Sequence, residues 1–136
     1  MNFNALIPEL TVSDLGRSLE FYLRLGFRLE YGREGFAFLS LQGAQLMLEQ
    51  FHETGWNTGE LVQPFGRGVN FQLEVEDLSP MLAALRAIDY PLYRPPYETW
   101  RRVKGEEIGE AEFLVQDPDG YLLRFSKYLG GRPLDR

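Results

Sequence analysis

Carboxylates are the side chains in this sequence with the clearest capacity for acid–base chemistry. Glu9, Glu49, Glu74 and Glu112 all lie in segments with the composition of strands, where a rigidly held carboxylate can act as a general base. The single histidine, His52, and the absence of cysteine exclude a Ser-His-Asp or Cys-His arrangement. Each glutamate could equally lie on a solvent-facing side of its strand, so catalysis and a purely structural role both stay open.

Aromatic side chains are the second set of candidates, because they can stack on a flat ligand. Trp56 and Trp100 are predicted in loops, beside glycines or charges, where stacking on a ligand is more natural than a core position. Phe36 and Phe38 are two residues apart and share one face of a strand, which suits the core and a pocket equally. The full set of aromatic candidates is Phe36, Phe38, Phe51, Trp56, Phe65, Tyr97 and Trp100.

Length and composition narrow the class of protein. The 136 residues are enough for one domain whose core needs no disulfide or structural metal, and 44% of them are apolar. No apolar run is long enough to cross a membrane and the N-terminus lacks signal-peptide features, so we expect a cytoplasmic protein. A net charge of −6 argues against nucleic acid as a partner. This acidity could be ordinary surface charge, or it could attract a cationic ligand.

The elements that must position these residues occur twice. Val12-Ser13-Asp14-Leu15 is repeated as Val75-Glu76-Asp77-Leu78, at an offset of 63 residues (77 − 14 = 63). In the first half, Ser13 and Asp14 are good N-caps for a helix that Gly26 ends. The strands predicted in this half are 5–12, 27–32, 35–41 and 45–51.

The second half repeats this order. A helix capped by Asp77 or Ser79 follows the first strand, and an irregular stretch carries Tyr97 and Trp100. Asp117-Pro118-Asp119-Gly120 is a strong turn signal before the last strand. The strands predicted in this half are 68–75, 90–94, 111–116 and 121–127.

Each half is therefore a βαβββ module, and two open curved sheets of that kind bury their faces by pairing. We predict a single α+β domain, residues 1–136, made of modules at about 4–51 and 68–128 that are joined by a linker at 52–67.

These features together resemble the vicinal oxygen chelate superfamily, over roughly residues 5–128. The resemblance rests on the paired modules, the V-x-D-L helix starts, Leu25-Gly26-Phe27 after the first helix and Asp117-Pro118-Asp119-Gly120 before the last strand. The superfamily includes glyoxalase I, extradiol dioxygenases, and fosfomycin- and bleomycin-resistance proteins, and its fold is a curved mixed-sheet half-barrel. Ile7-Pro8-Glu9-Leu10-Thr11 looks most like strand one of the bleomycin-binding proteins.

The resemblance implies a homodimer. In the bleomycin-binding proteins the first strand crosses to the partner subunit and a proline marks the exchange, so Pro8 is the expected hinge. Proline cannot donate to a sheet ladder, however, so a bulged edge strand within one subunit is the alternative.

The resemblance also indicates where enzymes of the superfamily hold a divalent cation. Measured from the repeated tetrads, two of the four positions carry Ile7 and Asn70. Arg124, four residues after Gly120, occupies the third, and the fourth lies near residues 46–48. These side chains offer few of the anionic or imidazole donors that such an ion needs. Glu49 could serve only if the register shifted. We therefore expect no catalytic metal and no cofactor.

Asn70 and Arg124 are expected to line a ligand groove instead. A buried arginine needs a carboxylate partner, which Glu112 or Glu49 could supply. Arg124 could anchor a carboxylate or phosphate of a ligand, or it could form an internal salt bridge that fills the former metal position.

The favoured hypothesis is a metal-free binding protein that sequesters a bulky, flat, cationic small molecule. Enzyme activity is left open as the less favoured function. The resemblance implies bleomycin-family glycopeptides, and another metabolite also fits a fold that serves many functions. One alternative is a divergent glyoxalase-type lyase or isomerase with Glu49 as metal ligand or base. The other is a dimeric regulatory or scaffold domain without a small ligand.

Overall fold

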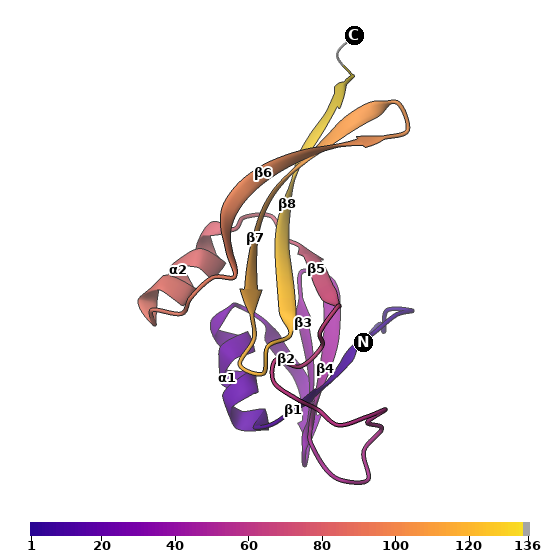
Figure 1. Cartoon of the computed structure of the whole chain (residues 1–136), viewed down its shortest axis with the longest axis vertical. Helices are drawn as coiled ribbons and strands as arrows, with labels where there is room; N and C mark the ends of the chain where they lie inside the picture. The colour runs from indigo at the N-terminus through magenta and orange to yellow at the C-terminus, as the bar shows by residue number, and fades with distance from the viewer. Residues whose placement is uncertain (135–136) are drawn as a thin grey trace. The chain divides into compact units, whose positions relative to one another are not determined.

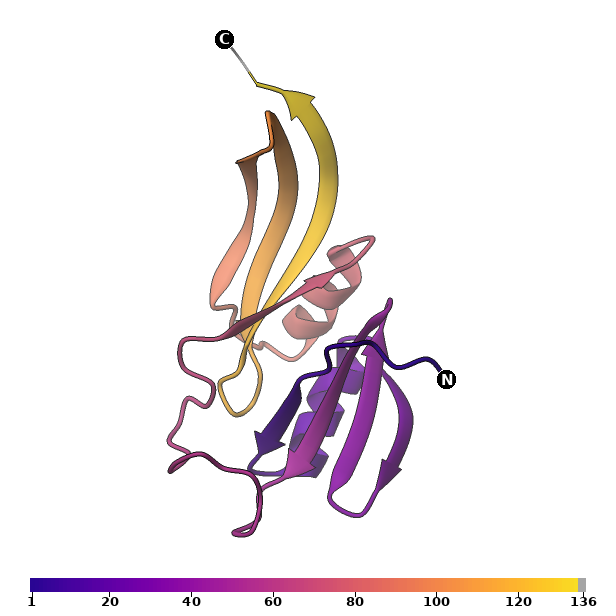
Figure 2. The same ribbon diagram turned by 90° about the vertical axis from the view of Figure 1, so that its right-hand side faces the viewer.

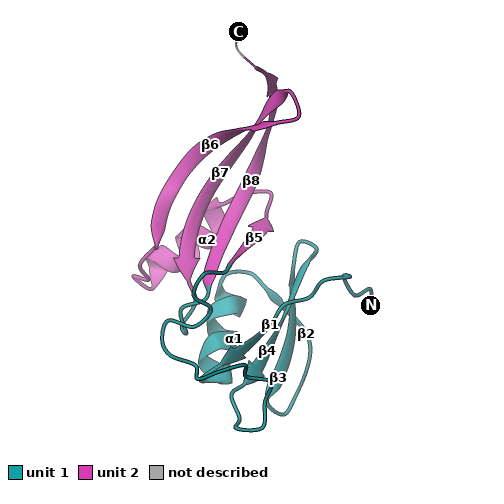
Figure 3. Cartoon of the chain, turned by 45° about the vertical axis from the view of Figure 1, so that its right-hand side comes forward, with its two compact units in different colours: residues 1–69, 117–121 teal, residues 70–116, 122–136 magenta. Residues whose placement is uncertain are grey.

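The computed structural model describes residues 1–134. Two compact units make up the chain, and Figure 3 colours them separately. Unit 1 comprises residues 1–69 together with 117–121, and unit 2 comprises residues 70–116 and the chain from Leu122 onward. Neither helix in residues 1–134 is long and apolar enough to span a bilayer.

Unit 1 is a four-stranded sheet with a helix on one face. Its elements are β1 (Glu9–Val12), α1 (Leu15–Arg24), β2 (Arg28–Arg33), β3 (Phe36–Leu41) and β4 (Ala44–Gln50). The strand order is β1-β4-β3-β2, with β1 parallel to β4 and the other neighbours antiparallel (Figure 2).

Helix α1 begins where the sequence predicts. Asp14 is the N-cap, and its carboxylate accepts a hydrogen bond of 3.1 Å from the amide of Arg17. Gly26 follows the helix with a φ of +104°, a left-handed conformation that glycine adopts at least cost. Phe21 and Tyr22 of the helix are buried. The buried strand residues on the face that α1 covers are Leu10, Val12, Ala37, Leu39, Leu41, Leu46 and Leu48.

Unit 2 repeats the same order of elements. They are β5 (Asn70–Glu74), α2 (Ser79–Ala87), β6 (Arg94–Val103), β7 (Glu106–Gln116) and β8 (Leu122–Pro133), in the sheet order β5-β8-β7-β6 (Figure 1). Because β5 is parallel to β8, as β1 is to β4, the two units share one topology. The predicted α+β fold with two βαβββ modules is thus confirmed.

Four of the predicted strand ranges were wrong. Of the predicted strand 90–94 only Arg94 is in a strand, and β7 and β8 extend the predicted strands 111–116 and 121–127 to residues 106 and 133. The errors at the first strand and at β6 have a physical cause. The first strand begins at Glu9 rather than at residue 5, because Pro8 directly before it has no amide hydrogen for the ladder. The stretch predicted to be irregular after residue 94 is the strand β6. Pro95-Pro96 does not interrupt this strand, because β6 lies at the edge of its sheet and its register shifts there.

The turn Asp117-Pro118-Asp119-Gly120 joins β7 to β8 as predicted, and it belongs to unit 1. Asp117 accepts a hydrogen bond of 2.7 Å from the hydroxyl of Tyr22. Asp119 is fully buried and accepts bonds from the amide and the hydroxyl of Ser13, at 2.9 and 2.5 Å, and from Gln63. The turn therefore completes the polar interior of unit 1, a role that turn propensity alone does not predict.

Candidate ligand-binding site

The face of the unit 1 sheet opposite α1, here called the outer face, carries the candidate residues of this unit. Glu9 on β1 pairs with Met47 on β4, and Thr11 pairs with Glu49. Phe36 on β3 pairs with the same Glu49 from the other side. Because paired and alternate residues of a sheet share a face, the two glutamates and the predicted phenylalanine all project from the outer face.

Phe36 and Phe38 lie on the outer face, but other side chains cover them. Their exposed fractions are 5% and 1%. Tyr31 stacks on Phe38 at 5.1 Å between ring centroids, and Phe3 meets the same ring edge-on at 5.4 Å. The guanidinium of Arg33 lies 3.8 Å from the ring centroid of Phe36. In unit 1 as described, both phenylalanines serve as core residues, and their contact with a ligand stays a prediction.

A pocket of about 320 Å³ opens on the outer face, here called the Glu9 pocket. Glu9 and Glu49 share one face of the sheet, and both line this pocket. Burial raises the pKa of Glu9, and the neighbouring carboxyl group of Glu49 raises it further, against the opposing charge of Arg33. Two adjacent carboxyl groups make this pocket suited to a cation. Its lining residues are Glu9, Thr11, Met47, Glu49, Gln50, His52, Gly55, Trp56 and Asn57.

The loop after β4 supplies the aromatic side of the Glu9 pocket. Trp56 lies in this loop, as predicted, and is 96% exposed. The ring nitrogens of His52 lie 3.1 Å from Oε1 of Glu49 and 3.1 Å from Oγ1 of Thr54. The histidine thus ties the loop to β4 next to the carboxyl pair, and the indole of Trp56 is available to stack on a planar group.

A second cavity of unit 1, here called the Phe51 pocket, has a volume of about 540 Å³. It brings together Phe51 and Phe65, two of the aromatic residues predicted to bind a ligand. Its lining residues are Ser13, Phe51, Glu53, Asn57, Gly59, Glu60, Leu61 and Phe65.

In unit 2 the predicted residues Tyr97, Glu112 and Arg124 meet on one face of the sheet. Glu112 is fully buried and accepts hydrogen bonds from the hydroxyls of Tyr97, at 2.5 Å, and Ser126, at 3.0 Å. Nε of Arg124 lies 3.6 Å from Oε1 of Glu112, and Nη2 donates to Gln72. Arg124 therefore forms the internal salt bridge that the sequence left open, and its role as a ligand anchor stays a prediction.

Glu110 and Glu112 form a second carboxyl pair on this face. A hydrogen bond to Glu112, followed by burial, raises the pKa of Glu110. Burial alone would raise the pKa of Glu112, but hydrogen bonds from Glu110, Tyr97 and Ser126, together with the charge of Arg124, hold that pKa below its ordinary value. A proton shared by the pair therefore resides on Glu110, and Glu112 stays ionised.

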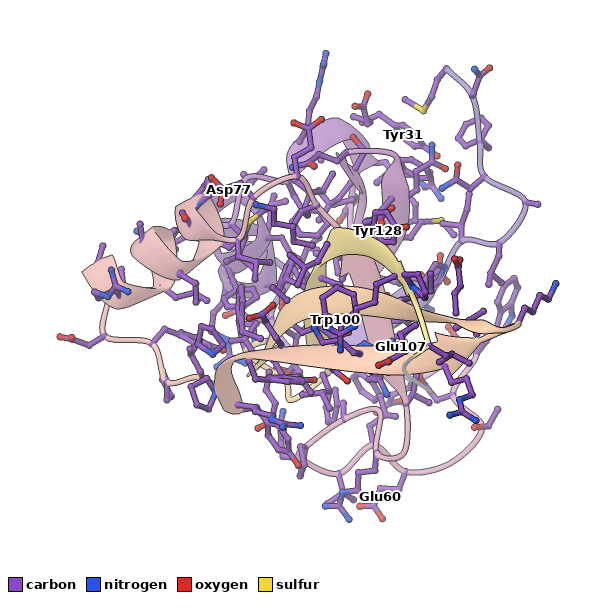
Figure 4. All side chains as sticks on the ribbon, turned by 90° about the horizontal axis from the view of Figure 1, so that it is seen from above. Tyr31, Glu60, Asp77, Trp100, Glu107 and Tyr128 are labelled. Atoms are coloured by element: carbon purple, nitrogen blue, oxygen red, sulfur yellow. The ribbon has the colours of Figure 1, made fainter. Side chains whose placement is uncertain are left out.

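Asn70 and Trp100 take different positions relative to this cluster. Asn70 is the exposed first residue of β5, two positions before Gln72 and on the same face of the sheet. Trp100 lies on β6 and not in the predicted loop, and it is an odd number of positions from Tyr97, so it faces the other side of the sheet. Figure 4 labels Trp100. A Cβ atom on Gly109 would come within 2.5 Å of the Trp100 ring, and the guanidinium of Arg132 lies 3.8 Å from its centroid.

The positions at which the resemblance places metal ligands do not fit a divalent cation. Ile7 is apolar, Asn70 offers a weak carbonyl donor, and Arg124 carries a positive charge that is already paired with Glu112. No group of three or more His, Asp or Glu side chains within residues 1–134 is placed to hold a metal ion.

The strand registers identify the fourth position. Glu9 pairs with Met47 in unit 1 as Gln72 pairs with Arg124 in unit 2, so Met47 is the counterpart of Arg124. Glu49 lies two residues beyond Met47 and shares its face, so the expectation that Glu49 needs a register shift was wrong.

Three polar residues of the unit 2 cluster, Gln72, Glu110 and Ser126, were not predicted. The repeat could have identified Gln72, because it is the counterpart of Glu9 at the same offset (72 − 9 = 63). Glu110 and Ser126 carry no comparable signal, because only the β7–β8 register brings them beside Glu112.

Comparison with known proteins finds similar sequences and similar folds over nearly the whole chain. A bleomycin resistance protein of Geobacillus stearothermophilus is 27% identical over 128 residues, which cover 88% of this chain and 92% of that protein. The structure of TioX from Micromonospora sp. ML1 superposes with a TM-score of 0.69 at 20% identity, covering 93% of this chain and all of that one. A bleomycin-binding protein complexed with bleomycin superposes with a TM-score of 0.60 at 20% identity, covering 92% and 98%.

A family model matches residues 5–125, nearly the whole of both modules. The chain therefore belongs to the Glyoxalase/Bleomycin resistance protein/Dioxygenase superfamily.

Proposed function

We propose that this protein sequesters a bulky, flat, cationic small molecule of the bleomycin class, without a bound metal and without changing the ligand chemically. The observation that carries the proposal is the Glu9 pocket, where two carboxyl groups lie beside the exposed indole of Trp56. Carboxylates attract a cation, and an indole face stacks on a planar group or a cation. The 27% identity to a bleomycin resistance protein supports the choice of ligand class.

Two aromatic residues outside this pocket belong to the proposal. Phe51 and Phe65 offer further apolar contact in unit 1. The net charge of −6 adds a long-range attraction for cations.

We propose that the protein acts as a cytoplasmic homodimer. In the N-terminal segment, the side chains of Phe3 and Leu6 are 59% and 84% exposed, and a partner subunit could cover them. Pro8, directly before β1, is the hinge if the first strand is exchanged.

A glyoxalase-type lyase or isomerase is the second candidate function. It is favoured by the contact of 3.1 Å between Glu49 and His52, since a carboxylate beside an imidazole can act as a base.

Isothermal titration calorimetry of the purified protein with copper-free bleomycin tests the proposal. We expect saturable binding that weakens in Glu49→Gln, and no stoichiometric divalent metal in elemental analysis. A stoichiometric metal, or turnover of a glyoxalase substrate, would favour the enzyme. Absence of binding heat at any bleomycin concentration would reject the ligand class.

A further inference from the structure

The Phe51 pocket, like the Glu9 pocket, combines an exposed aromatic side chain with two carboxyl groups. Phe51 is 45% exposed, although it is a large apolar side chain beside a cavity. Two exposed glutamates, Glu53 and Glu60, line the same cavity, and no lysine or arginine among the described residues does (Figure 4 labels Glu60 in its loop). An apolar ring beside two carboxylates is a surface that suits an aromatic cation.

The apolar wall of this pocket is firmly held. The amide of Phe51 donates to the carbonyl of Val12 at 2.8 Å, which extends the β1–β4 ladder by one residue. The amide of Phe65 donates to the carbonyl of Asp119 at 2.8 Å, and its ring meets Tyr121 edge-on at 6.0 Å. The ring of Phe65 is therefore packed in place, and the backbone that carries Phe51 is fixed by the ladder, so a ligand has little of this wall to order on binding.

Asn57 lines both pockets. Its amide donates to the carbonyl of Gly55 at 2.9 Å, and its side-chain nitrogen lies 3.4 Å from the carbonyl of His52. The two cavities therefore adjoin across one residue, and a single molecule can reach both.

We propose that the ligand is bipartite, with two cationic aromatic groups joined by a flexible linker that passes Asn57. One group occupies the Glu9 pocket against Trp56, and the other occupies the Phe51 pocket between Phe51 and the carboxylates of Glu53 and Glu60. This inference rests on the proposed function, because it assigns the Glu9 pocket to the first of the two groups. Linking two groups that fit neighbouring pockets raises affinity by roughly 10²–10⁴ without any new kind of contact.

Two probes test the inference by calorimetry: benzamidine, with one aryl amidinium group, and 1,5-bis(4-amidinophenoxy)pentane, with two. We expect the wild type to bind the double cation at least about tenfold more tightly than benzamidine, at one molecule per chain. The double variant Glu53→Gln/Glu60→Gln should remove most of that advantage and leave unchanged the part of benzamidine binding that Glu9→Gln weakens. The matched control Glu34→Gln/Glu98→Gln removes the same charge from exposed positions outside both pockets and should change neither affinity by more than about twofold.

The outcomes separate this inference from the proposed function. Suppose that benzamidine binds and that Glu9→Gln weakens this binding. The bipartite ligand is then wrong if the double cation binds no more tightly than benzamidine, or if it keeps its advantage in Glu53→Gln/Glu60→Gln. In either case the proposed function stands. If neither probe binds the wild type, the bipartite ligand is wrong, and the bleomycin titration alone decides the proposed function.

Discussion

Glu9 and Glu49 lie on the same face of the parallel strands β1 and β4, and both line the Glu9 pocket. Burial raises the pKa of Glu9 above the ordinary glutamate value of 4.5, and the neighbouring carboxyl group of Glu49 raises it further, so a proton is held more tightly at this pair. A bound cation would favour loss of that proton, so ligand binding and protonation are linked at this pair.

Affinity for a cation is therefore expected to rise with pH. Below the raised pKa of Glu9 the pair holds a proton and attracts a cation weakly, and above it both carboxylates are charged. Between pH 4.5 and 7.5 we expect the affinity for benzamidine to increase by about fivefold, the upper end for one partly exposed ion pair. Glu9→Gln should flatten the profile measured by calorimetry, whereas Glu34→Gln should not. An equally steep profile in Glu9→Gln would show that another group carries the dependence.

The contact between Trp100 and Gly109 predicts a steric effect on stability. Gly109→Ala places a methyl group against the Trp100 ring and should lower the free energy of unfolding by about 1–3 kcal/mol. Combined with Trp100→Ala the same change should cost much less, because the two residues are coupled. Gly131→Ala is the control, since its new Cβ meets only the flexible side chain of Glu106 at 3.4 Å. If denaturant unfolding shows that the losses in free energy of the two single variants add up in the double variant, the contact is contradicted.

The hydroxyl of Tyr97 should stabilise unit 2 through Glu112. Tyr97→Phe leaves one oxygen of a buried carboxylate without this donor, so the free energy of unfolding should fall by about 1–3 kcal/mol. Tyr93→Phe makes the same chemical change at a side chain that is 62% exposed and should have little effect. Equal losses in the two variants would mean that the Tyr97 hydroxyl has no special role.

Asp117 should make folding stability depend on pH in the acidic range. Burial, against the hydrogen bonds from Tyr22 and two backbone amides, raises its pKa from 3.8 to about 6. The folded state therefore binds the Asp117 proton more tightly than the unfolded chain does, and this contribution is complete below pH 3.8. It is lost as the pH rises to 6, and the free energy of unfolding falls by at most about 3 kcal/mol.

Asp117→Asn should remove this contribution. Denaturant unfolding at pH 4 and pH 6.5 measures it, with Asp89→Asn as a control at an exposed aspartate. If the free energy of unfolding changes by the same amount between pH 4 and pH 6.5 in Asp117→Asn and in the wild type, other groups carry the dependence.

The repeated tetrads and the turn signals predicted most of the fold, because each depends on local chemistry. Asp14 caps α1 and Gly26 ends it for reasons visible in the residues themselves. Because of Pro95-Pro96, the sequence predicted no strand where β6 lies. An edge strand can contain prolines, but only the sheet order shows that β6 is at an edge.

The candidate site could be predicted only in part. Residue type identified Trp56 and Glu112, and the structure places the first beside a pocket and the second in a polar cluster. The pairing of Glu9 with Glu49 depends on the β1–β4 register, which periodicity within one strand does not reveal. Trp100 has the same residue type as Trp56, but its strand directs it to the face away from Tyr97 and Glu112.

The fluorescence of Trp56 during a bleomycin titration tests the central claim most directly. The chain has two tryptophans, so Trp100→Phe leaves Trp56 as the sole reporter and Trp56→Phe leaves Trp100. We predict that Trp100→Phe shows a saturable change in emission as bleomycin binds, and that Trp56→Phe shows none and binds more weakly by calorimetry. An unchanged Trp56 emission at a bleomycin concentration that saturates the calorimetric signal would place the ligand elsewhere and contradict the account.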